Sequence, residues 1–96
     1  MPVTVGDLTA TVTKIMPTAS TAGMHLKLVD SSTGLTVIDK DYTVQYAPAD
    51  GLNVSQRDEV QKRMQRDINV YKAKKAVYDT AAMGTAATFI ENNLNL

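Results

Sequence analysis

Residues 55–82 read SQRDEVQKRMQRDINVYKAKKAVYDTAA and repeat apolar side chains at the spacing of an α-helix. One stripe of a helical wheel collects six of them, Val60, Met64, Ile68, Tyr71, Tyr78 and Ala82. Ser55 precedes Asp58 by three residues, which resembles a capping box and predicts that the helix begins at Ser55. Residues 55–82 therefore predict one long amphipathic helix.

A second apolar strip begins midway along this predicted helix. It consists of Val70, Ala73, Val77 and Ala81, which lie well away from the first stripe on the wheel. A helix that is apolar on two sides needs two partners. We expect the sheet to be one partner, and the strip to be an interaction surface for either the final segment of the chain or another copy.

The end of the long helix is predicted at residues 83–85. Gly84 can close a helix in a left-handed conformation, and Thr85 can cap the next one. A short terminal helix then follows, with apolar residues at helical spacing. Its Phe89 is the only phenylalanine of the chain and is expected to anchor the core.

The first half of the chain is typical of β-structure. In residues 8–13, Leu8, Ala10 and Val12 alternate with three threonines, so each set shares one face of a strand. Residues 24–28 alternate in the same way, with Met24 and Leu26 opposite His25. Residues 30–34 end in Gly34 and predict a hairpin turn, whereas residues 18–23 are small and polar and predict a loop.

The strand after the hairpin changes parity. Leu35 and Val37 are odd-numbered, whereas Ile38, Tyr42 and Val44 are even-numbered. A continuous strand would then present its apolar residues on both faces. A β-bulge or a small turn near residues 39–41 would restore the register, and both remain open at this point.

Strands followed by helices define the α+β class. We therefore predict a single domain over residues 1–96. A small antiparallel sheet of three to four strands fills residues 1–47, and it packs against the long helix and the short C-terminal helix of residues 54–95.

Composition excludes several kinds of chemistry. The 96 residues contain no cysteine and one histidine, so disulfides and thiolate metal sites are impossible. No phosphate-binding loop, dinucleotide fingerprint or zinc-protease motif is present. We therefore predict no enzyme activity, no catalytic residues, no cofactor and no metal. His25 is expected to be an ordinary strand residue, and Asp39 and Asp41 to be polar positions that protect an edge strand.

Basic residues gather on the predicted long helix. Lys62, Arg63 and Arg66 form a possible basic patch, although the chain has zero formal net charge. This patch motivates one alternative, a monomeric module that binds a peptide or nucleic acid.

The absence of catalytic patterns, together with the second apolar strip, favours a structural or protein-interaction role. The expected partner is protein, above all the chain itself as a homo-oligomer, with nucleic acid less favoured and no membrane. In its general style, with strands before helices, this small chain resembles phage and prophage structural or accessory proteins, and no motif carries this resemblance. The N-terminus shows no secretory signal pattern. The expected location is cytoplasmic, or an assembled virion if the chain is phage-derived.

Overall fold

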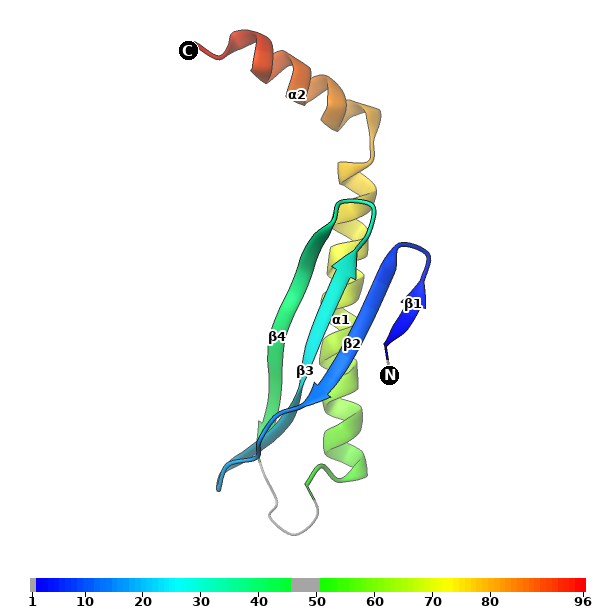
Figure 1. The fold of residues 1–96 in the computed structure, drawn as a ribbon, viewed down its shortest axis with the longest axis vertical. Coiled ribbons are helices and arrows are strands. Elements are labelled where there is room, and N and C mark those ends of the chain that lie inside the picture. Colours follow the sequence, from blue (N-terminus) through cyan, green and yellow to red (C-terminus); the bar gives the residue numbers. More distant parts are fainter. Residues whose placement is uncertain (1, 46–50) are drawn as a thin grey trace. The chain divides into compact units, whose positions relative to one another are not determined.

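The chain folds into a four-stranded antiparallel sheet followed by two helices, as Figure 1 shows. The computed structural model describes residues 2–45 and 51–96. The strands are β1 (Val3–Val5), β2 (Leu8–Lys14), β3 (Thr21–Asp30) and β4 (Leu35–Gln45), and they lie side by side in chain order. The helices are α1 (Val54–Tyr78) and α2 (Ala81–Asn93). The predicted α+β class is confirmed, and the short strand β1 is an addition that the sequence patterns did not mark.

The chain forms two compact units, Met1–Arg66 and Asp67–Leu96, whose boundary lies inside α1. The first unit, the sheet unit, contains the sheet and the first half of α1. The second, the helical unit, contains the rest of α1 and α2. The end of the predicted β half, including Tyr46, lies outside the described residues, and the prediction of one domain stays a prediction.

Pairing of the strands confirms the predicted faces of the sheet. Ala10 and Val12 of β2 stand opposite Leu28 and Leu26 of β3. Because directly opposed residues share a face, these four side chains lie on one side, which we call the inner face. The threonines of β2 and His25 of β3 lie on the other side, the outer face.

A β-bulge in β4 accounts for the change of parity in the sequence. Ile38 pairs with Leu28, but the next residue of β3, Val29, pairs with Thr36, which leaves Val37 as the extra residue. The bulge brings Leu35 onto the inner face with Ile38. The irregularity therefore lies at Val37, and residues 39–41 are regular strand rather than the predicted site of a bulge or turn.

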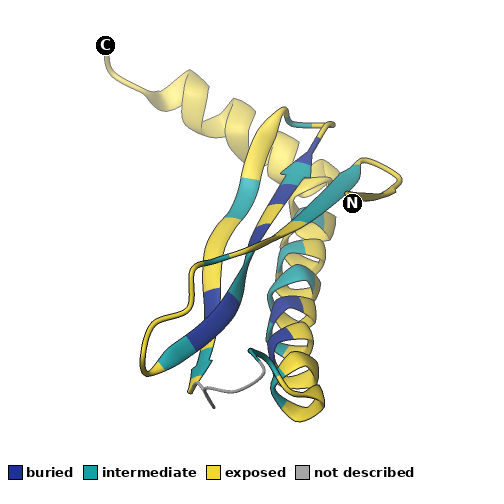
Figure 2. Cartoon of the chain, turned by 60° about the horizontal axis from the view of Figure 1, so that its bottom comes forward, coloured by how far each residue is buried: buried dark blue, intermediate teal, exposed yellow. Residues whose placement is uncertain are grey.

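The core of the sheet unit lies between the inner face and the first turns of α1. Leu26, Leu28 and Tyr42 are 1–2% exposed, and Val60 and Met64 of α1 are 4% and 7% exposed. Figure 2 shows this burial on the middle of the sheet and on the helix beside it. The first members of the predicted apolar stripe are thus the residues that hold α1 on the sheet.

Gly23 allows β3 and β4 to approach closely. A β-carbon at this position would lie 1.9 Å from the carbonyl oxygen of Tyr42, which is far inside van der Waals contact. The expected loop at residues 18–23 is therefore wrong at its C-terminal end, because β3 already begins at Thr21. The strand extends there since glycine permits pairing opposite Thr43.

The residue that caps the start of α1 is not the predicted one. The side chain of Asn53 accepts a hydrogen bond from the Gln56 backbone N–H at 2.8 Å, and the Gln56 side chain accepts one from the Asn53 N–H at 3.1 Å. This reciprocal pair is a capping box built on Asn53, so the predicted Ser55–Asp58 box is wrong. Gln56 also donates to the carbonyl oxygen of Gln45, which ties the start of α1 to the end of β4.

The break between the helices lies at Asp79 and Thr80, earlier than predicted. Thr80 adopts an extended conformation, with φ −74° and ψ 150°, and its hydroxyl donates to the carbonyl of Val77 at 2.8 Å. Short polar side chains compete in this way with helical hydrogen bonds. Gly84 continues as part of α2 among alanines, at a cost of about 1 kcal/mol relative to alanine. The predicted break at residues 83–85 is therefore wrong.

Replacing Leu26 tests where the core lies. Leu26→Ala should lower the free energy of unfolding by about 2–5 kcal/mol, because the side chain is fully buried and the change leaves a cavity. The control is Val12→Ala, which removes the half-exposed neighbour that pairs with Leu26 and should cost about 1 kcal/mol or less. Urea denaturation measures both, and equal losses would contradict the assigned core.

Removing the cap of α1 tests the revised helix start. Asn53→Ala should cost about 0.5–2 kcal/mol of unfolding free energy, because it removes the acceptor for the Gln56 N–H. Ser55→Ala is the matched control and should change stability little, since Ser55 is exposed and lies inside the helix. A larger loss for Ser55→Ala in thermal denaturation would restore the original assignment.

Candidate functional site

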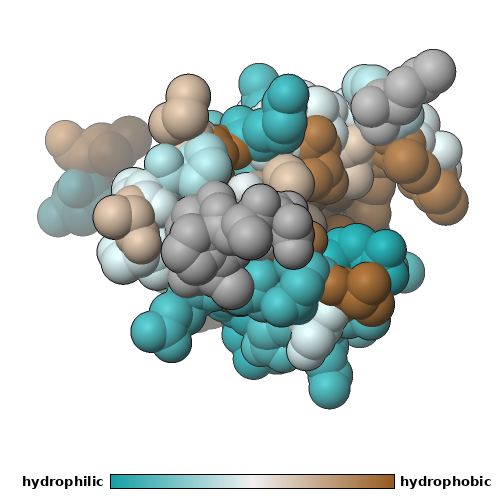
Figure 3. Space-filling model, turned by 90° about the horizontal axis from the view of Figure 1, so that it is seen from below, coloured by the Kyte–Doolittle hydropathy of each residue, from teal (hydrophilic) through white to brown (hydrophobic). Residues whose placement is uncertain are grey.

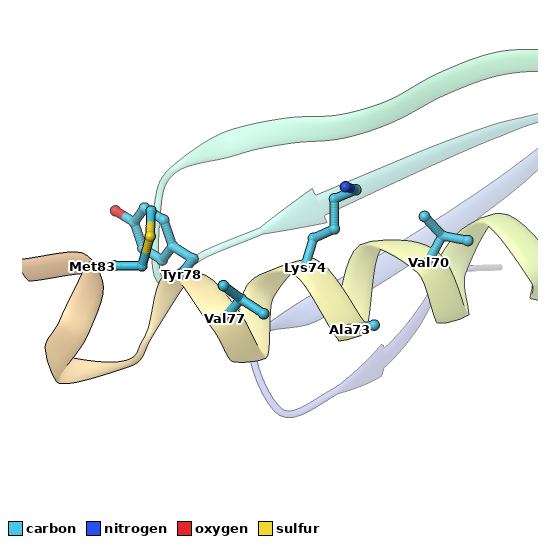
Figure 4. A pocket seen from close by; sticks show the side chains of 6 residues that line it. All are labelled: Val70, Ala73, Lys74, Val77, Tyr78 and Met83. Atoms are coloured by element: carbon cyan, nitrogen blue, oxygen red, sulfur yellow. The ribbon is translucent and has the colours of Figure 1, made fainter. Parts of the chain in front are cut away.

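An apolar groove lies on the helical unit. It is lined by Val70, Ala73, Lys74, Val77, Tyr78 and Met83, and its volume is about 470 Å³. Figure 4 shows the side chains of α1 along one side of the helix and Met83 of α2 beside the ring of Tyr78. Except for the amine of Lys74 and the hydroxyl of Tyr78, the lining side chains are apolar, so the groove suits an apolar occupant.

The turn between the helices builds the end of this groove. Lys75 binds both carboxylate oxygens of Asp79 at 2.8 Å, and its amine lies 5.4 Å from the centre of the Tyr78 ring. Lys75 falls inside the first apolar stripe, and its charge is paired with Asp79 at the end of α1. The extended Thr80 then redirects the chain, so that Met83 joins the groove.

The structure brings together three of the four residues predicted for the interaction surface. Val70, Ala73 and Val77 line the groove, with Val70 and Val77 51% and 58% exposed. Ala81 lies instead in a second groove, on α2, lined by Ala81, Gly84, Thr85, Thr88, Phe89 and Asn92. The separation follows from the helix break at Thr80, which interrupts the helical spacing between Val77 and Ala81.

Every residue of α2 is exposed, including its large apolar ones. Phe89 is 67% exposed, Ile90 56% and Met83 45%. The expectation that Phe89 anchors the core is therefore wrong. The apolar residues of α2 do recur at helical spacing, but none of them is buried.

The predicted basic patch divides into two kinds of residue. Lys62 and Arg66 are exposed. Arg63 instead donates to the carbonyl oxygen of Thr43 at 2.6 Å, and its guanidinium lies 5.8 Å from the centre of the Tyr42 ring. Arg63 thus ties α1 to β4, a contact that leaves Lys62 and Arg66 as the solvent-facing members of the patch.

A histidine–aspartate cluster lies on the outer face of the sheet. Nδ1 of His25 is 2.6 Å from Oδ1 of Asp41, which stands opposite it in the β3–β4 register. Its Nε2 forms a hydrogen bond with Oδ1 of Asp39, two residues before Asp41 on the same face. The His25 side chain is 29% exposed and both aspartates are about twice as exposed. The cluster therefore uses both ring nitrogens of the only histidine.

Hydrogen bonds within this cluster change the titration of the histidine. The bond with Asp41, and next the bond with Asp39, raises the pKa of His25 above its ordinary value of 6.5, and partial desolvation opposes them. We expected neither bond from the sequence. The signal was the i,i+2 spacing of Asp39 and Asp41, but their pairing with His25 depends on where the bulge lies.

In the part of the chain that the structure describes, no three histidine, aspartate or glutamate side chains are placed so that they could hold a metal ion together. Neither helix in the described ranges is long and apolar enough to cross a membrane. On the end of the molecule that Figure 3 draws, brown apolar areas are separated by hydrophilic ones, as on ordinary protein surfaces.

Comparisons of this chain with protein-family models, curated proteins and solved structures found no match.

Titration of His25 tests the cluster directly. The imidazole signal of the only histidine, followed by NMR, should titrate with a midpoint above 6.5. Asp41→Asn should lower this midpoint more than Asp39→Asn, because the bond with Asp41 contributes most to the raised pKa. Glu59→Gln removes an exposed carboxylate elsewhere in the sheet unit and should leave the midpoint unchanged. A wild-type midpoint at or below 6.5 would show that the cluster does not form in solution.

Proposed function

We propose that this chain is a non-enzymatic, cytoplasmic assembly protein that associates with further copies of itself through its helical unit. The observation that carries the proposal is α2, a helix of 13 residues in which no residue is buried. Helices of this length are marginal in water unless one face packs against something. A second copy of the chain would supply that packing.

The composition of α2 is unlike that of a solvated helix. Its only charged residue is Glu91, whereas Met83, Phe89 and Ile90 are apolar and exposed. A helix that stays in solvent normally carries many charged side chains. Exposed apolar area of this kind marks interaction sites more often than free surface.

The helical unit contains features that complement each other between copies. Phe89 projects 67% exposed from α2, and the groove beside Val77 is apolar and open. A protruding aromatic ring and an apolar groove on one chain can fill each other reciprocally in a two-fold dimer. This self-complementarity favours a second copy over an unrelated partner.

The alternative is a monomeric module that binds a peptide or nucleic acid through the basic face of α1, and it stays a prediction. The bond between Arg63 and the Thr43 carbonyl weakens it, because Arg63 already has a structural contact. The resemblance to phage structural proteins also stays a prediction.

Light scattering behind a sizing column tests the assembly proposal on the whole chain. Wild-type protein should form a discrete oligomer that persists at about 1 M salt. At this concentration the Debye screening length is roughly 3 Å, so most attraction between exposed charges is removed. Val77→Glu places a charge in the groove and should weaken association about tenfold or more. Phe89→Ala should weaken it in the same way from the other side.

Ala76→Glu is the matched control, because Ala76 is exposed on α1 beside Val77 and does not line the groove. It adds the same charge and should leave the oligomer intact. A wild-type monomer at all concentrations would overturn the proposed function. An oligomer that both Val77→Glu and Phe89→Ala leave unchanged would show that the surface is elsewhere.

A further inference from the structure

We propose that His25 is a proton-dependent clasp that holds the middle of the edge strand β4 on the sheet. In the protonated form its ring donates one hydrogen bond to Asp41 and one to Asp39. In the neutral form one of these bonds is lost, and β4 separates more readily from β3. The proposal concerns the sheet unit and does not depend on the proposed assembly.

The clasp rests first on the alternation of β4. Asp39 and Asp41 are two residues apart, so both carboxylates project from the outer face. His25 stands opposite Asp41 in the neighbouring strand, and its ring reaches one carboxylate with each nitrogen. One side chain of β3 therefore holds two positions of β4.

The hydrogen bonds themselves require the proton. An ionised carboxylate only accepts hydrogen bonds, so both ring nitrogens must carry hydrogen to bond Asp39 and Asp41 at once. Only the imidazolium form has two N–H groups. The neutral ring would turn a lone pair toward one of the carboxylates and lose that bond.

By strand register, the neighbours of His25 on the outer face, besides Asp39 and Asp41, include Thr13 and Lys27. From β2, the uncharged Thr13 stands opposite His25. On β3, Lys27 shares the outer face and stands opposite Asp39. Lys14 and Lys40 belong to the inner face by register.

The position of the clasp explains why β4 depends on it. β4 is the last strand of the sheet and pairs with β3 on one side, and residues 39–41 are exposed. The bulge at Val37 already interrupts the ladder two residues before Asp39. Beyond the clasp, Thr43 and Gln45 are tied to α1 through Arg63 and Gln56. Residues 38–42 thus lie between the bulge at Val37 and the residues of β4 that are bonded to α1.

The sign of the pH effect follows from the raised pKa of His25. A group whose pKa is higher in the folded state stabilises that state fully below its unfolded value of 6.5. This stabilisation is lost as the pH rises through the folded value. For each unit by which the pKa is raised, loss of the proton increases the equilibrium constant for opening of the strand about tenfold.

Hydrogen exchange followed by NMR on the full chain tests the clasp at pH 6 and pH 9. Among residues 38–42, the amides that face β3 should lose protection several-fold at pH 9 in the wild type, in line with about tenfold for each unit of raised pKa. In His25→Gln their protection factors should already be low at pH 6 and nearly independent of pH. Amides in the β2–β3 ladder should change little in both proteins and serve as the internal reference.

Two further variants keep the test decisive. Asp39→Asn/Asp41→Asn keeps the ring and the shape of both side chains but removes the charges, and it should also abolish the pH dependence. Glu59→Gln removes a charge outside the cluster and should behave like the wild type. Equal wild-type protection of residues 38–42 at both pH values would overturn the clasp, as would an unchanged pH dependence in His25→Gln or in the double variant.

Discussion

The structure of the sheet unit depends on one row of side chains on the inner face of β3. Leu26 and Leu28 are almost fully buried, and Tyr42, Val60 and Met64 close over them from β4 and α1. The bulge at Val37 serves this row, because it keeps Ile38 and Tyr42 on the same side of the sheet as Leu35. Gly23 serves it as well, since the close approach of β3 and β4 leaves no room for a β-carbon. Loss of the row would leave α1 with no buried contact on the sheet.

Local patterns predicted the fold where one physical rule acts alone, and failed where several residues compete for one role. Alternation placed Met24 and Leu26 on one face of their strand and His25 on the other, because side-chain direction in a strand has a fixed period of two. The cap of α1 was predicted at Ser55, but Asn53 caps the helix because Gln56 completes its box. The break was predicted at Gly84, but it lies at Thr80, whose hydroxyl bonds the Val77 carbonyl, and Gly84 continues within α2.

The candidate surfaces show the same limit. Helical spacing predicted that Val70, Ala73 and Val77 share a strip, and they do line one groove. The same spacing wrongly placed Ala81 in this strip, because α1 ends at Tyr78, before Ala81. The cluster of His25 with Asp39 and Asp41 was beyond the sequence patterns, since its register across two strands depends on a single extra residue, Val37. A long-range pairing of this kind requires the position of the bulge before any residue can be matched.

The contacts of Gln56 and Arg63 with β4 have a consequence for how the sheet can grow. Both side chains occupy carbonyl groups of an edge strand, at Gln45 and Thr43, where an incoming strand would otherwise bond. The helix that completes the core thereby also closes one end of this edge to strand addition. Continuous sheets running from chain to chain, the route by which edge strands produce fibrils, are blocked at that end. Two hydrogen bonds from one face of α1 therefore protect part of an edge strand against the addition of another strand.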